Sequence, residues 1–340
     1  MTTVPPSDPA AAPAVSVIIP AYNAARTLPL QLEALAAQVD PPAFEVIVVD
    51  NGSSDDLAAA VQPFLGGPLD LRVLRAEAHQ GASYARNVGI GAARAELLMF
   101  CDADDAVSAR WLAQGAAAFE TADLWTGMAH LLPQGAFEHP LEVIRARFDV
   151  EPSQEDAVVE VRQGDGQALP VLFGGDFGAR RDLLLRLGGF DQSFPLAGDD
   201  NDLAFRAQRA GVSLHSAEHL RVGCRGHWSA SDQLRIVRRS ARAHCLLMQR
   251  YDAWPASQMP RWHTELLRCA GAGLKMLSRR QTPDWFGLIH RTSIAWGLAE
   301  GTVRYRWLRR MPDAQIGVGL QEAAAPSMDM HPTPEDEASR

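Results

Sequence analysis

The sequence has few cysteines and lacks the patterns of several common protein classes. Its four cysteines lie far apart without a CxxC pair, which argues against a disulfide scaffold and against a thiolate metal site. No HExxH motif is present, so a zinc enzyme is not expected. No apolar run approaches the roughly 20 residues that a membrane span needs, and the N-terminus shows no signal-peptide pattern. We therefore expect a cytoplasmic protein.

Positive charge is scarce in most of the chain and concentrated near its end. The 340 residues carry a formal net charge of -9, which argues against bulk binding to nucleic acid. Residues 234–310, by contrast, contain 15 Lys or Arg against four acids, with Trp262, Trp285, Trp296 and Trp307 among them. This segment predicts basic helices that contact either an anionic membrane, at its inner face, or a second copy of the chain.

The first third of the chain alternates strand-like and helix-like segments. Residues 15–19 and 44–49 are β-branched runs typical of buried strands, and leucines recur at helical spacing across residues 27–38. A strand, a helix and a strand in this order predict parallel pairing. The alternation continues at residues 71–74, 82–93 and 96–100. We expect an open α/β sheet whose strand-end loops meet in one ligand-binding crevice.

The middle of the chain is less regular. Residues 134–169 are acidic without sustained periodicity and predict a variable connection or a short strand pair. Leucines over residues 181–187 predict a short helix, and residues 199–210 predict another that Gly211 ends. This half is expected to supply the second side of the site.

An acidic segment directly follows the strand expected at residues 96–100. Asp102 and Asp104 would leave the sheet where the crevice opens, and a nucleotide diphosphate beside them requires a divalent cation, Mg²⁺ or Mn²⁺. The alternative is that these acids only end the strand and cap the next helix. Asp50, which follows the second strand, is likewise either part of a turn or an acceptor for a base or ribose.

Two further segments carry charged or polar groups toward the same crevice. Gly81 opens a helix that places Arg86 on its first turns, where it suits anionic donor groups unless it is simply exposed. His227 follows an apolar run and is either a metal or phosphate ligand or, as a lone histidine more often is, structural.

A second acidic cluster stands at the start of the helix expected from residue 199. Helix-dipole stabilisation explains one or two of these acids, but a third less easily. Like charges raise the pKa of one carboxylate, so Asp200 is our candidate general base for an acceptor hydroxyl. Asp199 would orient the acceptor, and Asp202 would form a structural ion pair with Arg206.

Together these segments resemble the family 2 glycosyltransferases. The matching motifs run in the family's order at residues 17–23 (VIIPAYN), 48–55 (VVDNGSSD), 81–87, 102–104 (DAD), 188–191 (GGFD) and 199–203 (DDNDL). The resemblance implies a GT-A fold, a nucleotide-diphospho-sugar donor, Mg²⁺ or Mn²⁺, and inversion at the anomeric carbon. It implies a role in polysaccharide or glycoconjugate biosynthesis.

Carried over by position, the resemblance assigns roles to individual residues. Asp200 would be the catalytic base with Asp199 beside it, and the metal would be held by Asp104, Asp102 and His227. The donor would be contacted by Pro20, Tyr22, Asn23, Asp50, Ser53, Arg86, Asp102 and Ala103. The chain departs from the family at Asp199, where Glu is common, and at Asn51, where a second Asp is usual.

The same reasoning divides the chain into segments and leaves two rival functions. We expect a disordered N-terminus at 1–14 and a GT-A domain at 15–232, with a nucleotide-binding half at 15–130 and an acceptor half at 131–232. A helical basic extension at 233–312 and a disordered tail at 313–340 follow. The rivals are a non-catalytic nucleotide-sugar-binding protein on the same fold and a sugar nucleotidyltransferase. A GxGxxG turn is absent after the early strands, which disfavours a dinucleotide-dependent oxidoreductase.

Overall fold

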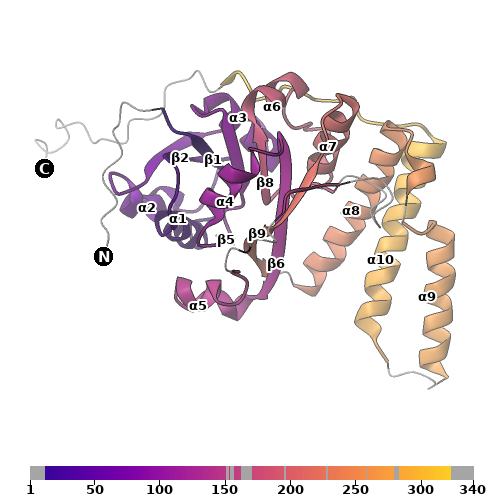
Figure 1. Ribbon diagram of the computed structural model, residues 1–340. Helices are drawn as coiled ribbons and strands as arrows, with labels where there is room; N and C mark the ends of the chain where they lie inside the picture. The colour runs from indigo at the N-terminus through magenta and orange to yellow at the C-terminus, as the bar shows by residue number, and fades with distance from the viewer. Residues whose placement is uncertain are drawn as a thin grey trace, which may run out of the picture.

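A mixed sheet with helices on both faces forms the body of the molecule (Figure 1). The computed structural model describes residues 12–150, 153, 157–161, 171–194, 197–226, 229–257, 259–278 and 283–322. The first four long strands pair in parallel in the order β3-β2-β1-β4. Their bounds, with the helices between them, are β1 (Val15–Ala21), α1 (Leu28–Ala36), β2 (Phe44–Asp50), α2 (Leu57–Val61), η1 (Gln62–Phe64), β3 (Asp70–Arg75), α3 (Ala82–Ala92) and β4 (Leu97–Cys101). The predicted parallel α/β unit is therefore confirmed.

The second half of the sheet is antiparallel to the first where the two meet. Strand β8 (Asp176–Arg180) runs antiparallel to β4 and to β6 (Leu124–Pro133), and β9 (His215–Gly226) lies parallel to β6. Two-residue strands β5 (Ala106–Val107) and β7 (Val159–Glu160) pair with β9. The elements between them are α4 (Trp111–Ala118), η2 (Gln134–Glu138), α5 (Leu141–Arg145), α6 (Arg181–Leu187) and α7 (Asp199–Arg209). The irregular connection predicted at 134–169 thus contains η2, α5 and β7, and part of it lies outside the described residues.

Alternation along β1 shows how the sheet separates two cores. Val17 and Ile19 belong to the core under α1 and α4, whereas Ile18 belongs to the core under α3, α6 and α7. Side chains that alternate across a pleated strand bury apolar area on both faces, as parallel sheets require. Helix α3 lies so close that a Cβ on Gly89 would stand 2.5 Å from Ile18 Cγ2. Glycine at this position lets the helix approach the strand.

Three long helices and a π-helical turn form the C-terminal part (Figure 1). They are α8 (Ala230–Arg250), η3 (Trp254–Ala256), α9 (Trp262–Leu277), α10 (Trp285–Gly301) and η4 (Thr302–Trp307). A third apolar cluster joins α8 and α10 to the body through Phe194 and Phe205. Helix α9 packs on α10 and projects with it away from the sheet. Within the described part of the chain, no helix is both long and apolar enough to cross a membrane.

Residues 313–322 pack against the body, and the expectation of disorder from residue 313 is wrong for this stretch. The side chain of Asn87 on α3 donates to the carbonyl of Val318 at 2.8 Å, and Gly317 N donates to Gly188 O at 2.8 Å. The phenol of Tyr84, also on α3, donates to Glu322. Composition predicted disorder because it does not reveal such distant hydrogen-bond partners. The remainder of that predicted tail, 323–340, lies outside the described residues, as do residues 1–11 of the N-terminal one.

Candidate functional site

The site lies at the carboxyl ends of β1, β2 and β4, where three predicted loops meet. In the loop after β2, the Asp50 carboxylate accepts from the backbone N–H of Ser53 at 2.9 Å. The Ser53 hydroxyl in turn accepts from the N–H of Asn23 at 3.0 Å, and Asn23 Oδ1 accepts from Ser54 N at 2.7 Å. These bonds tie the loop after β1 to the loop after β2, so that the two present one continuous rim.

Asn51 supports this rim through buried hydrogen bonds. Its side chain is buried, its Nδ2 donates to Ala76 O and His79 O at 2.5 and 2.7 Å, and its Oδ1 accepts from Gly81 N at 2.7 Å. The residue therefore fixes the start of α3 relative to β2. Sequence reasoning did not assign Asn51 a role, although a polar residue directly after a buried strand was a usable signal.

Arg86 is the buried cation of the site. Its guanidinium donates to Asp102 Oδ1 at 3.0 Å and to Asp199 Oδ2 at 3.5 Å, and it lies 5.4 Å from the centre of the Phe190 ring. Burial alone would lower the pKa of Arg86, but the charges of Asp102, Asp199 and Asp200 raise it, so it remains a cation. Arg86 thus joins the acid loop after β4 to the acidic start of α7.

The three acids after β4 have different surroundings. Asp102 is part-exposed and bound to Arg86, and Asp104 lines a cavity beside the loop after β1. Asp105 points inward, where it accepts from Cys224 Sγ at 3.2 Å and from Arg225 N at 3.2 Å. Burial, with the charges of Asp102 and Asp104, raises the pKa of Asp105 well above its usual range. A purely structural role, the alternative that the sequence left open for the acids of this segment, fits Asp105.

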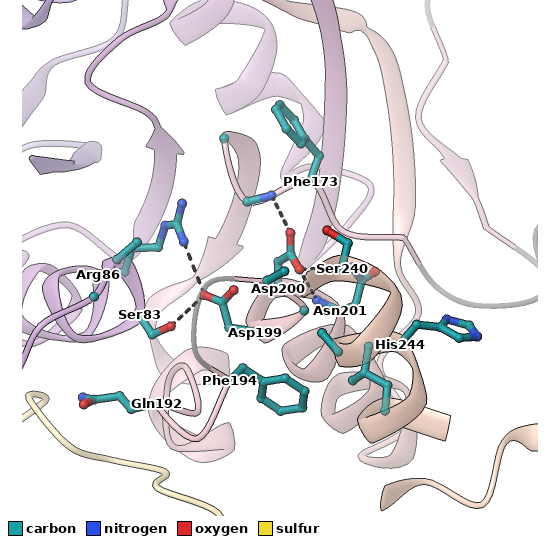
Figure 2. Close-up of a pocket in the computed structure, with 18 of the residues that line it drawn as sticks. Ser83, Arg86, Phe173, Gln192, Phe194, Asp199, Asp200, Asn201, Ser240 and His244 are labelled. Carbon is teal, nitrogen blue, oxygen red and sulfur yellow. Dashed lines mark hydrogen bonds and ion pairs between the residues drawn. The ribbon is translucent and has the colours of Figure 1, made fainter. Parts of the chain in front are cut away.

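The acids at the start of α7 also differ in their hydrogen-bond partners. Asp199 Oδ2 accepts from Ser83 Oγ at 2.7 Å and from Arg86 (Figure 2). Asp200 accepts from Gly174 N at 3.2 Å and from Asn201 N at 2.7 Å. Burial, together with the charge of Asp199, raises the pKa of Asp200 to about 6. At neutral pH Asp200 is therefore largely ionised, but more basic than an ordinary aspartate.

Asp202 is the third acid of this cluster and is structural. It is buried, and its Oδ2 accepts from Arg206 Nε at 2.8 Å, as the i, i+4 spacing predicted. Tyr251, which directly follows α8, donates to the other oxygen of Asp202 at 2.6 Å. This hydrogen bond ties the start of α7 to the end of α8.

Two adjoining cavities occupy this edge of the sheet and share Gln80, Gly81, Ala82 and Asp102. The smaller, of about 560 Å³, is lined by Pro20, Tyr22, Asn23, Asn51, Ala103 and Asp104 among others. The larger, of about 800 Å³, contains Arg86, Asp199 and Asp200 and is bounded by α8 (Figure 2). Asp50 and Ser53 line neither cavity and lie in the rim described above. His227 lies outside the described residues.

Sequence reasoning missed the contribution of α8 to the larger cavity. Its lining residues are Ser240, Ala243, His244 and Leu247. Their spacing places them on one face of the helix, and none is charged although α8 contains five arginines. An uncharged stripe in an arginine-rich helix was the signal available in the sequence.

The described residues offer two carboxylates to a metal ion at this site. Among the described residues, no group of three or more His, Cys, Asp or Glu side chains is placed to hold a metal ion. Asp102 and Asp104 offer carboxylate oxygens beside the smaller cavity. Mg²⁺ and similar ions are often held by one or two carboxylates together with phosphate oxygens of the substrate, so the donor set fits such an ion.

The architecture belongs to the GT-A class of nucleotide-sugar-dependent folds: a mixed α/β sheet with acid loops at its strand ends and a helical C-terminal part. The mannosyltransferase PcManGT of Pyrobaculum calidifontis, solved with GDP-Man and Mn²⁺, aligns over 89% of this chain and 90% of its own, with a TM-score of 0.56 and 20% identity. S. aureus TarS 1-349, solved with UDP, aligns over 86% of this chain and 91% of its own, with a TM-score of 0.50 and 18% identity. At these identities the likeness establishes the fold alone.

The sequence comparison points to the same class of protein. Residues 16–132, about a third of the chain, match the family model described as Glycosyl transferase family 2. Glycosyltransferase AglE of Haloferax volcanii is 38% identical over 104 residues, which cover 30% of this chain and 34% of that protein. Succinoglycan biosynthesis protein ExoU of Rhizobium meliloti is 40% identical over 105 residues, or 31% and 28% of the two chains. The matches therefore span about a third or less of these curated relatives.

Proposed function

We propose that this protein is a metal-dependent, inverting glycosyltransferase that moves a sugar from a nucleotide-diphospho-sugar to an acceptor hydroxyl. The observation that carries the proposal is Asp200, whose pKa is raised to about 6 in a cavity that also contains Arg86 and Asp102. A general base is most effective when its pKa lies near the working pH. The names of the relatives and the nucleotide-bound structures of the same fold support the same reading.

The donor side of the proposal uses the smaller cavity. Its walls bear Pro20, Tyr22 and Asn23 on one side and Ala103 and Asp104 on the other. We propose that the nucleotide lies between these walls, with Asp50 and Ser53 in the rim beside the base or ribose. Arg86 would attract the diphosphate where the two cavities meet, because it is a buried cation with an unpartnered Nε.

A divalent cation, Mn²⁺ or Mg²⁺, would be held by Asp104 and Asp102, with His227 as a third candidate ligand. When bound, such an ion supplies Lewis-acid stabilisation of the charge on the leaving diphosphate. The role of the chain is to place both carboxylates at one end of β4. Arg86 holds Asp102 by its Oδ1 and so fixes the orientation of that carboxylate.

The acceptor side uses Asp200 in the larger cavity. Its carboxylate is held by the N–H groups of Gly174 and Asn201, so it is oriented before the acceptor arrives. We propose that it removes the proton of the acceptor hydroxyl as that oxygen attacks the anomeric carbon from the side opposite the diphosphate. A single displacement of this kind inverts the configuration. Holding both substrates in line contributes on the order of 7 to 11 kcal/mol in well-oriented reactions.

The test is a thermal-shift screen of nucleotide diphosphates and nucleotide sugars with and without Mn²⁺. Ligands that bind the folded state raise its melting temperature. Asp104→Ala should lose the metal-dependent part of the shift, whereas Asp40→Ala, an exposed acid paired with Arg110, should retain it. If no nucleotide stabilises the wild type, or if Asp104→Ala responds to Mn²⁺ as the wild type does, the proposal is wrong. Binding without donor consumption in any acceptor mixture would instead favour a nucleotide-sugar-binding protein.

We also propose that residues 15–232 and 233–312 act as a transferase unit and a helical basic extension, and that α9 and α10 bring the enzyme to an anionic membrane. Leu267, Leu274, Trp285 and Trp296 project into solvent from this helical hairpin. The surrounding charge is positive, since residues 234–310 carry 15 Lys or Arg against four acids in an otherwise acidic chain. Apolar and indole side chains among cations suit an anionic lipid surface.

Co-sedimentation with vesicles at low salt tests the membrane contact. Vesicles containing phosphatidylglycerol should bind the protein, and neutral phosphatidylcholine vesicles should not. Leu267→Ser with Leu274→Ser should weaken binding without lowering the melting temperature, because both side chains are exposed. A protein that ignores anionic vesicles but forms dimers by light scattering would show that the hairpin binds a second copy.

A further inference from the structure

The end of the larger cavity that faces away from the donor loops differs in character from the rest. Helix α8 lines it with Ser240, Ala243, His244 and Leu247. The five arginines of α8 lie elsewhere on the helix, since none of them lines the cavity. A helix rich in arginine therefore turns an uncharged face toward the candidate base.

The other walls of this end are mostly apolar. Phe173 precedes the backbone amide that binds Asp200, and Phe194 lies on the opposite side of the acid pair in the view of Figure 2. Val171 and Met259 complete the lining. Arg250 anchors the segment that carries Phe194. Its guanidinium lies 4.9 Å from the Phe194 ring centre and donates to Ser193 Oγ at 3.1 Å. The apolar wall is thus a fixed part of the cavity.

The one titratable side chain that α8 contributes to this wall is also uncharged at neutral pH. Burial lowers the pKa of His244 to about 4, and its Nε2 is already hydrogen-bonded to Ser257 Oγ at 2.8 Å. In Figure 2, Arg86 lies on the far side of Asp199 and Asp200 from His244. An acceptor made only of sugar or anionic groups would therefore find few polar partners here, and burying its hydroxyls unpaired would be costly.

We propose that this end of the cavity is an acceptor subsite for an apolar group, so that the attacking hydroxyl belongs to a molecule with a hydrophobic aglycone. The inference rests on the proposed function, because Asp200 defines which end of the cavity faces the attacking oxygen. Ligand sites of this kind combine an apolar lining with a few well-placed polar groups. Here the polar group is the carboxylate of Asp200, and the apolar lining lies beyond it.

Ligand-observed saturation-transfer NMR with methyl, butyl and hexyl β-D-glucopyranoside tests the subsite on the full chain without requiring turnover. A fully buried methylene tightens binding by about fourfold. We therefore expect the dissociation constant to fall at least tenfold from the methyl to the hexyl probe, even with partial burial. Leu247→Asn should flatten the series. Met259→Gln, at a more exposed position that threatens folding less, should reduce its slope.

Leu267→Asn is the matched control, because it makes the same substitution as Leu247→Asn on the exposed face of α9. It should leave the chain-length dependence intact. A flat series in the wild type, or a slope lost in Leu267→Asn and kept in both cavity variants, would overturn the subsite. Nucleotide thermal shifts measured on the same samples distinguish failure of the proposed function from failure of the subsite. The absence of any nucleotide shift refutes the donor function, whereas the alkyl series tests the apolar subsite alone.

Discussion

Asp200→Asn should make the protein less active and, at alkaline pH, more stable. Burial and the charge of Asp199 raise the pKa of Asp200 from 3.8 to about 6. The folded state therefore binds this proton more tightly than the unfolded state, and the wild type loses stability as the pH rises from about 4 to about 6. A rise of this size corresponds to about 3 kcal/mol. Asparagine carries no charge and removes this loss.

The substitution also has a cost. The two carboxylate oxygens accept from Gly174 N and from Asn201, and an amide keeps only one acceptor oxygen. The lost hydrogen bond destabilises the variant by about 1 kcal/mol. The net expectation is a variant about 2 kcal/mol more stable than the wild type at pH 8 and about equal to it at pH 4.

Urea unfolding at pH 4 and pH 8 measures this difference in the free energy of unfolding, and both values avoid the isoelectric point near 5.6. Release of nucleotide diphosphate in the presence of acceptor should fall by roughly 10² to 10⁴-fold in Asp200→Asn. The wild-type kcat/KM should rise with pH and level off above about 6. Asp123→Asn, an exposed acid paired with Arg180, is the control and should change neither quantity. Full turnover in Asp200→Asn, or lower stability at pH 8, would refute the reasoning.

Three other substitutions test the framework of the site. Arg86→Ala leaves the acids around it without their buried cation and should lower the free energy of unfolding in urea by about 3 to 5 kcal/mol. The exposed Arg235→Ala should lower it by less than about 1 kcal/mol. Gly175→Ala places a Cβ 2.7 Å from an acid-loop carboxylate and should raise the Mn²⁺ concentration needed for thermal stabilisation, whereas Gly135→Ala meets nothing within 4 Å and should not. Burial raises the pKa of Glu45, but its hydrogen bonds and the nearby arginines outweigh this effect and lower the pKa. Glu45→Gln should therefore melt earlier than the wild type at pH 7, and the difference in melting temperature should narrow as the pH falls below the ordinary glutamate pKa of 4.5.

The strands and the position of the site were predictable because their signals are local. A buried parallel strand shows as a short β-branched run, and β1 and β2 differ from the predicted segments only at their ends. Acids that follow such strands must emerge at the carboxyl edge of the sheet, and Asp102 and Asp104 do line a cavity there. These inferences need only the sequence near each residue.

Contacts between residues far apart in the sequence determined the features that the sequence did not reveal. Asp105 stands next to Asp104 in the chain, but it turns inward to Cys224 on β9, a residue 119 positions away. Residues 313–322 have the composition of a tail, yet Asn87 gives them hydrogen-bond partners. The apolar wall formed by α8 likewise depends on how that helix docks on Phe194 and Phe205. Each outcome follows from tertiary contacts that no local window contains.

The contact between Asn87 and Val318 closes a loop of 231 positions, and this has a consequence for synthesis on the ribosome. The N-terminal half emerges first and begins to fold while the residues that it needs are still untranslated. Until then, one face of α3 lacks its hydrogen-bond partners and Tyr84 lacks its carboxylate. Closure of so long a loop carries an entropic cost that only the later contacts offset. The nascent chain is therefore most vulnerable to proteases in the interval before residue 318 leaves the exit tunnel.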